Sequence, residues 1–121
     1  MSSELVADRA CVLRVEGEID ISTAESLRAH LAEALDAEPA APVICDLAAV
    51  AFLDSVGIGV LVAACDQAAT SGRAFCVAGA RGQVRRTLEL VRLVELLPCF
   101  STVSEALDAG NAAWMSEAGS K

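Results

Sequence analysis

The spacing of apolar and polar residues predicts several strands along the chain. Residues 11–15 alternate apolar and polar side chains, which indicates a strand with one polar face. Residues 5–7 just before it would complete an antiparallel hairpin at a sheet edge. The runs at 43–47 and 74–78 are nearly all apolar, as in parallel strands that helices cover on both faces. Residues 96–100 contain Pro98 and predict a short edge strand.

Helices are predicted between and after these strands. A capping box, in which Ser22 bonds the helix backbone and Glu25 reaches back, would open the first helix. A second box, Thr102 with Glu105, would open the last helix, which we expect to run through about Trp114. Apolar residues recur at helical spacing after the first box and support this assignment.

The second helix is predicted from about Ser55 to Thr70, and a third amphipathic helix around residues 84–91. Strands that alternate with helices predict an α/β layered fold with right-handed crossovers. We expect a single domain with a mostly parallel sheet of four to five strands and about four helices. This domain should span residues 1–115, with a flexible C-terminal tail at 116–121.

Composition and charge narrow the class of function. The chain carries a net charge of −8 and only 3% aromatic residues, which disfavours nucleic acid and anionic membranes as partners. The first nine residues are polar, and the most apolar stretch, 58–64, is too short to span a bilayer, so we expect a cytoplasmic protein. The five cysteines form no CxxC pair and predict buried, reduced thiols without a metal site.

Ser55 is the strongest candidate for a functional residue. At the start of a helix its hydroxyl would lie near free backbone N–H groups and the positive end of the helix dipole, a place that suits a phosphate. A plain helix N-cap is the alternative interpretation. Leu53 replaces the first glycine of a nucleophile elbow, and the only histidine, His30, falls near the apolar side of the first helix. We therefore expect a serine that is modified, in a protein that is not an enzyme.

Small and acidic residues surround this serine in sequence. Gly57 and Gly59 indicate either close packing of the helix on the sheet or room for a partner, and the sequence does not separate the two. Asp20 and Asp54 both follow strands predicted to be parallel, so their turns should meet at one end of the sheet, together with the turn at 79–82. Aspartates that form turns are a simpler explanation than a metal site.

The segment 46–61 resembles the signature of the STAS domain, in the branch of the anti-sigma factor antagonists. The matching residues are Asp46, Leu47, Val50, Phe52, Leu53, Asp54, Ser55, Gly57, Ile58 and Leu61. Residues 17–20 followed by Thr23, and the strand at 75–77, are similar to further segments of that family. The resemblance covers roughly residues 13–107, and Val56 leaves Ser55 as the one hydroxyl in the motif.

The resemblance implies a switch protein without cofactor or catalytic residue. Its unphosphorylated form would bind an anti-sigma factor that is a serine kinase and so release a sigma factor. Phosphorylation of Ser55 would end that binding, and a serine phosphatase would reset it. The alternative is a STAS scaffold subunit of a signalling or lipid-transport complex. The residues expected to contact the partner are Asp20, Ser22, Thr23, Asp54, Val56, Gly57, Ile58 and Gly59.

Overall fold

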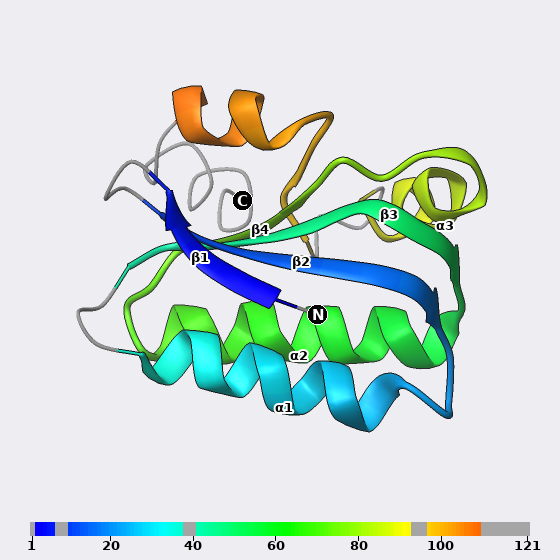
Figure 1. Cartoon of the computed structure of the whole chain (residues 1–121), viewed down its shortest axis with the longest axis horizontal. Coiled ribbons are helices and arrows are strands. Elements are labelled where there is room, and N and C mark those ends of the chain that lie inside the picture. The colour runs from blue at the N-terminus through cyan, green and yellow to red at the C-terminus, as the bar shows by residue number, and fades with distance from the viewer. Residues whose placement is uncertain (1, 7–9, 38–40, 93–96, 110–121) are drawn as a thin grey trace.

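A computed structural model describes residues 2–6, 10–37, 41–92 and 97–109 of the chain (Figure 1). Its strands form one five-stranded sheet in the order β1-β2-β3-β4-β5. The strands are β1 (Ser2–Val6), β2 (Ala10–Ile19), β3 (Val43–Leu53), β4 (Phe75–Ala78) and β5 (Cys99–Phe100). β1 pairs antiparallel with β2, and every other neighbouring pair is parallel. The mostly parallel sheet, its antiparallel edge hairpin and its short last edge strand are therefore confirmed.

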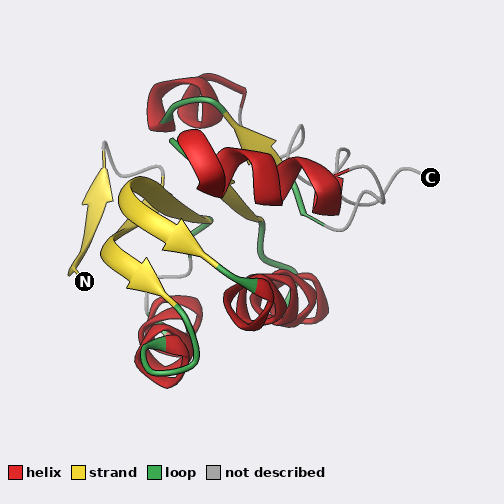
Figure 2. Ribbon diagram, turned by 90° about the vertical axis from the view of Figure 1, so that its right-hand side faces the viewer, coloured by secondary structure: helices red, strands yellow, loops and turns green. Residues whose placement is uncertain are grey.

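The helices cover both faces of this sheet. They are α1 (Ala24–Asp36), α2 (Ser55–Thr70), α3 (Gly82–Arg92) and a last helix at residues 103–109. Figure 1 shows α1 and α2 side by side under one face and the last helix over the other, and Figure 2 shows α1 and α2 end-on beneath the strands. The helix α3 packs against β3. The predicted helix end at Trp114 and the tail at 116–121 lie outside the described residues.

Two apolar clusters hold these layers together. The larger one joins the sheet to α1, α2 and α3 through side chains such as Leu27, Leu61 and Leu88. The smaller one lies under the last helix and contains Val12 and Ile44. Val12 is fully buried, although the alternating pattern placed it on a polar face, because the last helix covers this part of the sheet. Burial on both faces explains the continuous apolar runs in the central strands.

β3 extends six residues beyond the predicted end, to Leu53. From Leu47 onward the buried residues of β3, Leu47, Val50 and Leu53, are three apart, so the period of two that marks a strand is lost. The pairing with β2 is irregular in the same region, with register shifts between Arg14 and Glu16 and between Gly17 and Glu18. Bulges of this kind change which side chains point into the core, and they hide a strand from sequence patterns.

The second capping box is confirmed for Thr102, whereas Glu105 bonds the residue before the cap. The Thr102 hydroxyl accepts the backbone N–H of Glu105 at 3.0 Å, and the Glu105 carboxylate accepts the backbone N–H of Ser101 at 3.3 Å. The cysteines are all free thiols. Cys45, Cys65 and Cys76 are buried, Cys11 and Cys99 are half-buried, and burial raises the pKa of Cys45 to about 12. No helix in the described part of the chain is both long and apolar enough to cross a membrane.

Candidate functional site

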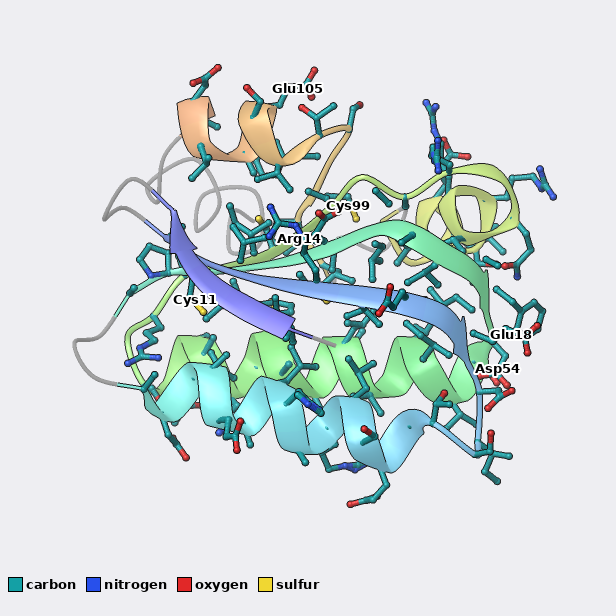
Figure 3. All side chains as sticks on the ribbon, viewed as in Figure 1. Cys11, Arg14, Glu18, Asp54, Cys99 and Glu105 are labelled. Carbon is teal, nitrogen blue, oxygen red and sulfur yellow. The ribbon has the colours of Figure 1, made fainter. Side chains whose placement is uncertain are left out.

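The carboxyl ends of β2 and β3 bring two loops together. Ile19 at the end of β2 pairs with Leu53 at the end of β3, and the backbone N–H of Asp54 donates to the Ile19 carbonyl at 3.2 Å. Residues 20–23 and 54–56 therefore lie side by side, as the parallel arrangement predicted. Figure 3 shows Glu18 and Asp54 close together at this end of the sheet. We refer to residues 18–23 and 52–59 as the switch end.

Asp54, and not Ser55, caps helix α2. Its Oδ1 accepts the backbone N–H of Val56 at 3.0 Å and that of Gly57 at 3.2 Å, while Asp54 itself has an extended backbone. Ser55 is the first helical residue, so the N-cap interpretation of the serine is wrong. The expectation of free N–H groups is wrong for Val56 and Gly57, because the Asp54 carboxylate already holds both. What remains at Ser55 is an exposed side chain with no hydrogen bond to any described residue.

Removing the Asp54 carboxylate should weaken the start of α2. We expect Asp54→Ala to lower the free energy of unfolding by about 0.5–2 kcal/mol, because two helix N–H groups lose their acceptor. Asp54→Asn keeps a side chain of the same length with an acceptor oxygen, so it should lower the free energy of unfolding by clearly less. Urea unfolding of both variants, followed by circular dichroism, measures the difference. Equal losses in the two variants would show that charge, and not the capping hydrogen bonds, is what Asp54 supplies.

Hydrogen bonds also fix the loop between β2 and α1. Asp20 Oδ1 accepts the backbone N–H of Ser22 at 2.9 Å and its hydroxyl at 2.7 Å. The Thr23 hydroxyl accepts the Asp20 N–H at 3.0 Å and donates to the Glu18 carbonyl at 2.8 Å. The two bonds from Ser22 to the carboxylate, that of the hydroxyl first, lower the pKa of Asp20 below its ordinary value. The loop thus presents Asp20 as an anion.

The first capping box is wrong. Thr23 is the N-cap of α1 and makes no side-chain cap bond, because its hydroxyl is directed to the loop. The Ser22 hydroxyl bonds Asp20, and Glu25 pairs instead with Arg28 at 3.8 Å. The sequence pattern identified the right region, but the side chains serve the loop that precedes the helix.

Exposed apolar side chains border Ser55. Val56 and Phe52 are each 39% exposed, and Ile21 is 80% exposed. Ile58, the expected apolar contact, is half-buried and packs against the main core. The sequence analysis did not include Ile21 and Phe52 among the expected contact residues, although both are exposed at this end of the sheet. The position of Ile21 among polar residues of a turn was the one sequence feature that could have indicated an exposed apolar side chain there.

The two glycines of α2 have different surroundings. Gly57 is buried, and a Cβ there would lie 2.5 Å from Ile19 Cγ2 and from Leu53 Cδ1. Gly59 is exposed, and a Cβ there would meet nothing within 4 Å. Close packing therefore explains Gly57, whereas only Gly59 leaves the helix surface open beside Ser55.

The start of α3 holds the end of β3. The Gln83 side chain accepts the Leu53 N–H at 3.1 Å and donates to the Leu53 carbonyl at 2.8 Å. Arg81 donates to the Ala48 carbonyl at 2.9 Å. These bonds place the turn at 79–82 beside the segment that leads to Ser55. Nothing in the sequence pointed to Gln83, because a polar residue at the start of a helix is usually solvated.

The site presents the side chain of Ser55 to solvent. His30 is half-buried on α1, and its Nδ1 lies 2.8 Å from the Ser26 carbonyl of the same helix. In the described residues, no three His, Cys, Asp or Glu side chains gather where they could hold a metal ion.

Comparison with known proteins agrees with this geometry. The family model of the STAS domain matches residues 5–106. The anti-sigma-F factor antagonist RsfB of Mycobacterium tuberculosis is 41% identical over 105 residues, which are 84% of each chain. A crystal structure of an anti-sigma factor antagonist from Mycobacterium paratuberculosis superposes with a TM-score of 0.76 at 34% identity, over 90% of this chain and 91% of that one.

A more distant structure shares the fold. The Bacillus cell fate determinant SpoIIAA in its phosphorylated form has a TM-score of 0.65 at 21% identity, and the match covers 88% of this chain and 96% of that one.

Proposed function

The chain belongs to the STAS domain family, in its anti-sigma factor antagonist branch, and from this premise we propose that it is a phosphorylation-controlled antagonist of an anti-sigma factor. Its unphosphorylated form binds the anti-sigma factor, a serine kinase, and the sigma factor is released. Transfer of a phosphate to Ser55 ends the binding. A serine phosphatase removes the phosphate and restores it.

The exposed Ser55 hydroxyl carries this proposal. It lies at the first position of α2, with no side-chain hydrogen bond to the described residues, directly after Asp54, whose backbone N–H is bonded to the end of β2. A kinase needs a hydroxyl that it can approach in line with the phosphate of ATP. Two relatives are anti-sigma factor antagonists, and SpoIIAA, which shares the fold, has a structure in its phosphorylated form. Both observations support the proposal that Ser55 is phosphorylated.

The surroundings of Ser55 suit a protein partner. Apolar side chains at Ile21, Phe52 and Val56 are exposed beside the carboxylates of Asp20 and Asp54. Apolar anchors inside a polar rim are the usual make-up of a protein interface. The acidic rim favours a partner with basic residues around an apolar centre, because complementary charges speed association and set orientation.

The phosphate switch acts at the surface and leaves the fold intact. Phosphoserine carries about −1.5 to −2 charges at neutral pH. At Ser55 this charge would lie next to the Asp54 carboxylate, which already occupies the N–H groups of Val56 and Gly57. The phosphate therefore projects into the partner's space as added bulk and charge. A partner would have to desolvate this group beside its own apolar contact residues, which is costly.

Kinase assays test the proposal directly. We expect incubation with ATP and the cognate anti-sigma factor to add one phosphate, which mass spectrometry locates at Ser55. Ser104 is a suitable internal control, because it is also exposed in the first turn of a helix, on the opposite face of the sheet. Stoichiometric phosphate at another residue, with Ser55 unmodified, would refute the proposal.

A further inference from the structure

A second site lies between α3 and the edge of the sheet. A cavity of about 230 Å³ opens there among residues of β4, α3 and β5. We propose that this cavity binds a small carboxylate that carries a short apolar body, such as a single aromatic ring or a short alkyl chain. The inference is independent of Ser55 and of the proposed switch.

The floor of the cavity is apolar. Val77 and Leu88 are almost fully buried, at 1% and 3% exposure, and they form its inner wall. The half-buried side chains of Ala80, Cys99 and Phe100 line the sides. Figure 3 shows Cys99 between α3 and the last helix in this view. An apolar group placed here would leave water for contact with apolar side chains, which is favourable.

The mouth of the cavity is cationic. Arg81 lines it from the turn before α3, and Arg85 and Glu89 line it from α3, so two arginines and one glutamate surround the mouth in a chain whose net charge is −8. Arg85 Nε lies 3.4 Å from Glu89 Oε2, but both side chains are more than half exposed, at 67% and 60%, so the pair is weak and a ligand carboxylate can replace Glu89. Arg81 uses one Nη for the Ala48 carbonyl and keeps further donors. A guanidinium is well suited to bind a carboxylate with two hydrogen bonds.

Size and position limit the ligand. An engineered apolar cavity of about 150 Å³ holds benzene, whereas drug-sized ligands occupy about 300–1,000 Å³. The cavity of about 230 Å³ therefore has room for one ring or a short chain with its carboxylate. Ala80 and Ser101 follow β4 and β5, so the cavity lies at the carboxyl ends of parallel strands, where open α/β sheets bind ligands.

The cavity also touches the segment that supports the switch end. Arg81 lines its mouth and bonds the Ala48 carbonyl of β3, and Gln83, two residues further, bonds both backbone groups of Leu53. A ligand at Arg81 would thus contact the turn that anchors the end of β3.

Nuclear magnetic resonance titration of the full chain tests the site with two probes, benzoate and hexanoate. We expect at least one to give saturable amide shifts centred on Ala80, Cys99 and Phe100. The uncharged benzamide and hexanamide are matched probes and should bind about tenfold more weakly, because they lack the charge-assisted contact with arginine. If neither carboxylate gives saturable shifts up to about 20 mM, the proposal is overturned. It is also overturned if the amides bind as tightly as the carboxylates.

Two arginine variants locate the carboxylate. Arg85→Gln should weaken benzoate binding about tenfold and leave benzamide unchanged. Arg86 is exposed on the same helix but does not line the cavity, so Arg86→Gln is the matched control and should bind like the unmodified protein. Equal losses in both variants would show a diffuse charge effect instead of a site. Shifts centred at the switch end, away from β5, would also contradict the proposal.

Discussion

Replacing Ser55 with aspartate should weaken binding to the anti-sigma factor by a factor of about 30 or more. Ser55→Ala should bind nearly as well as the unmodified protein. Ser55 is exposed between Asp54 and Val56, so the new carboxylate would enter the proposed interface beside an existing one. An unpaired charge buried at an interface costs about 2–5 kcal/mol, and 2 kcal/mol is about thirtyfold in affinity. The alanine removes only a hydroxyl that the fold does not use.

Isothermal titration calorimetry with the purified anti-sigma factor measures both affinities. Ser104→Asp is the matched control, because it adds the same charge in the first turn of the last helix, on the other side of the sheet. Its affinity should not change. Thermal unfolding should separate binding from stability, and we expect the melting temperatures of the Ser55 variants to stay within a few degrees of the unmodified protein. If Ser55→Ala lost as much affinity as Ser55→Asp, the hydroxyl itself would be a contact.

Alanine at Gly57 should destabilise the protein by about 1–3 kcal/mol, although alanine normally favours a helix. The added Cβ would lie 2.5 Å from Ile19 Cγ2 and from Leu53 Cδ1, and both of these side chains are fully buried, at 0% exposure. Neither can move aside without disturbing the core. The helix would have to shift away from the sheet at the point where it presents Ser55.

Gly59→Ala is the matched control for this prediction. It lies in the same helix, two residues away, and its Cβ would meet nothing within 4 Å. This substitution should leave stability unchanged or raise it by up to about 1 kcal/mol, the ordinary gain of alanine over glycine in a helix. Urea unfolding of the two variants gives the comparison. Stabilisation by both alanines would show that α2 does not approach the sheet as closely as the structure has it.

The sequence by itself determined the class of fold and the position of the candidate residue. The order of strands and helices follows from local periodicity, which burial on one or both faces imposes on each segment. The mostly parallel sheet followed from strands that alternate with helices. The start of α2 at Ser55 was also predictable, because an acidic turn separates two apolar segments there. All of these features depend on residues that are near one another in the chain.

The tertiary structure decided what each residue at the switch end does. Asp54 is the cap of α2 because pairing of β3 with β2 extends its backbone and leaves Ser55 in the first turn. Gly57 is required because Ile19, far away in sequence, packs against it, while Gly59 has no such neighbour.

Distant parts of the chain likewise create the features that no local pattern contains. The bond between Gln83 and Leu53 joins α3 to β3, and the cavity at Arg85 and Cys99 forms only where α3 meets β5. Periodicity reports whether a side chain faces the core. It does not report which side chain lies opposite, and hydrogen bonds, steric fit and cavities depend on that choice of neighbour.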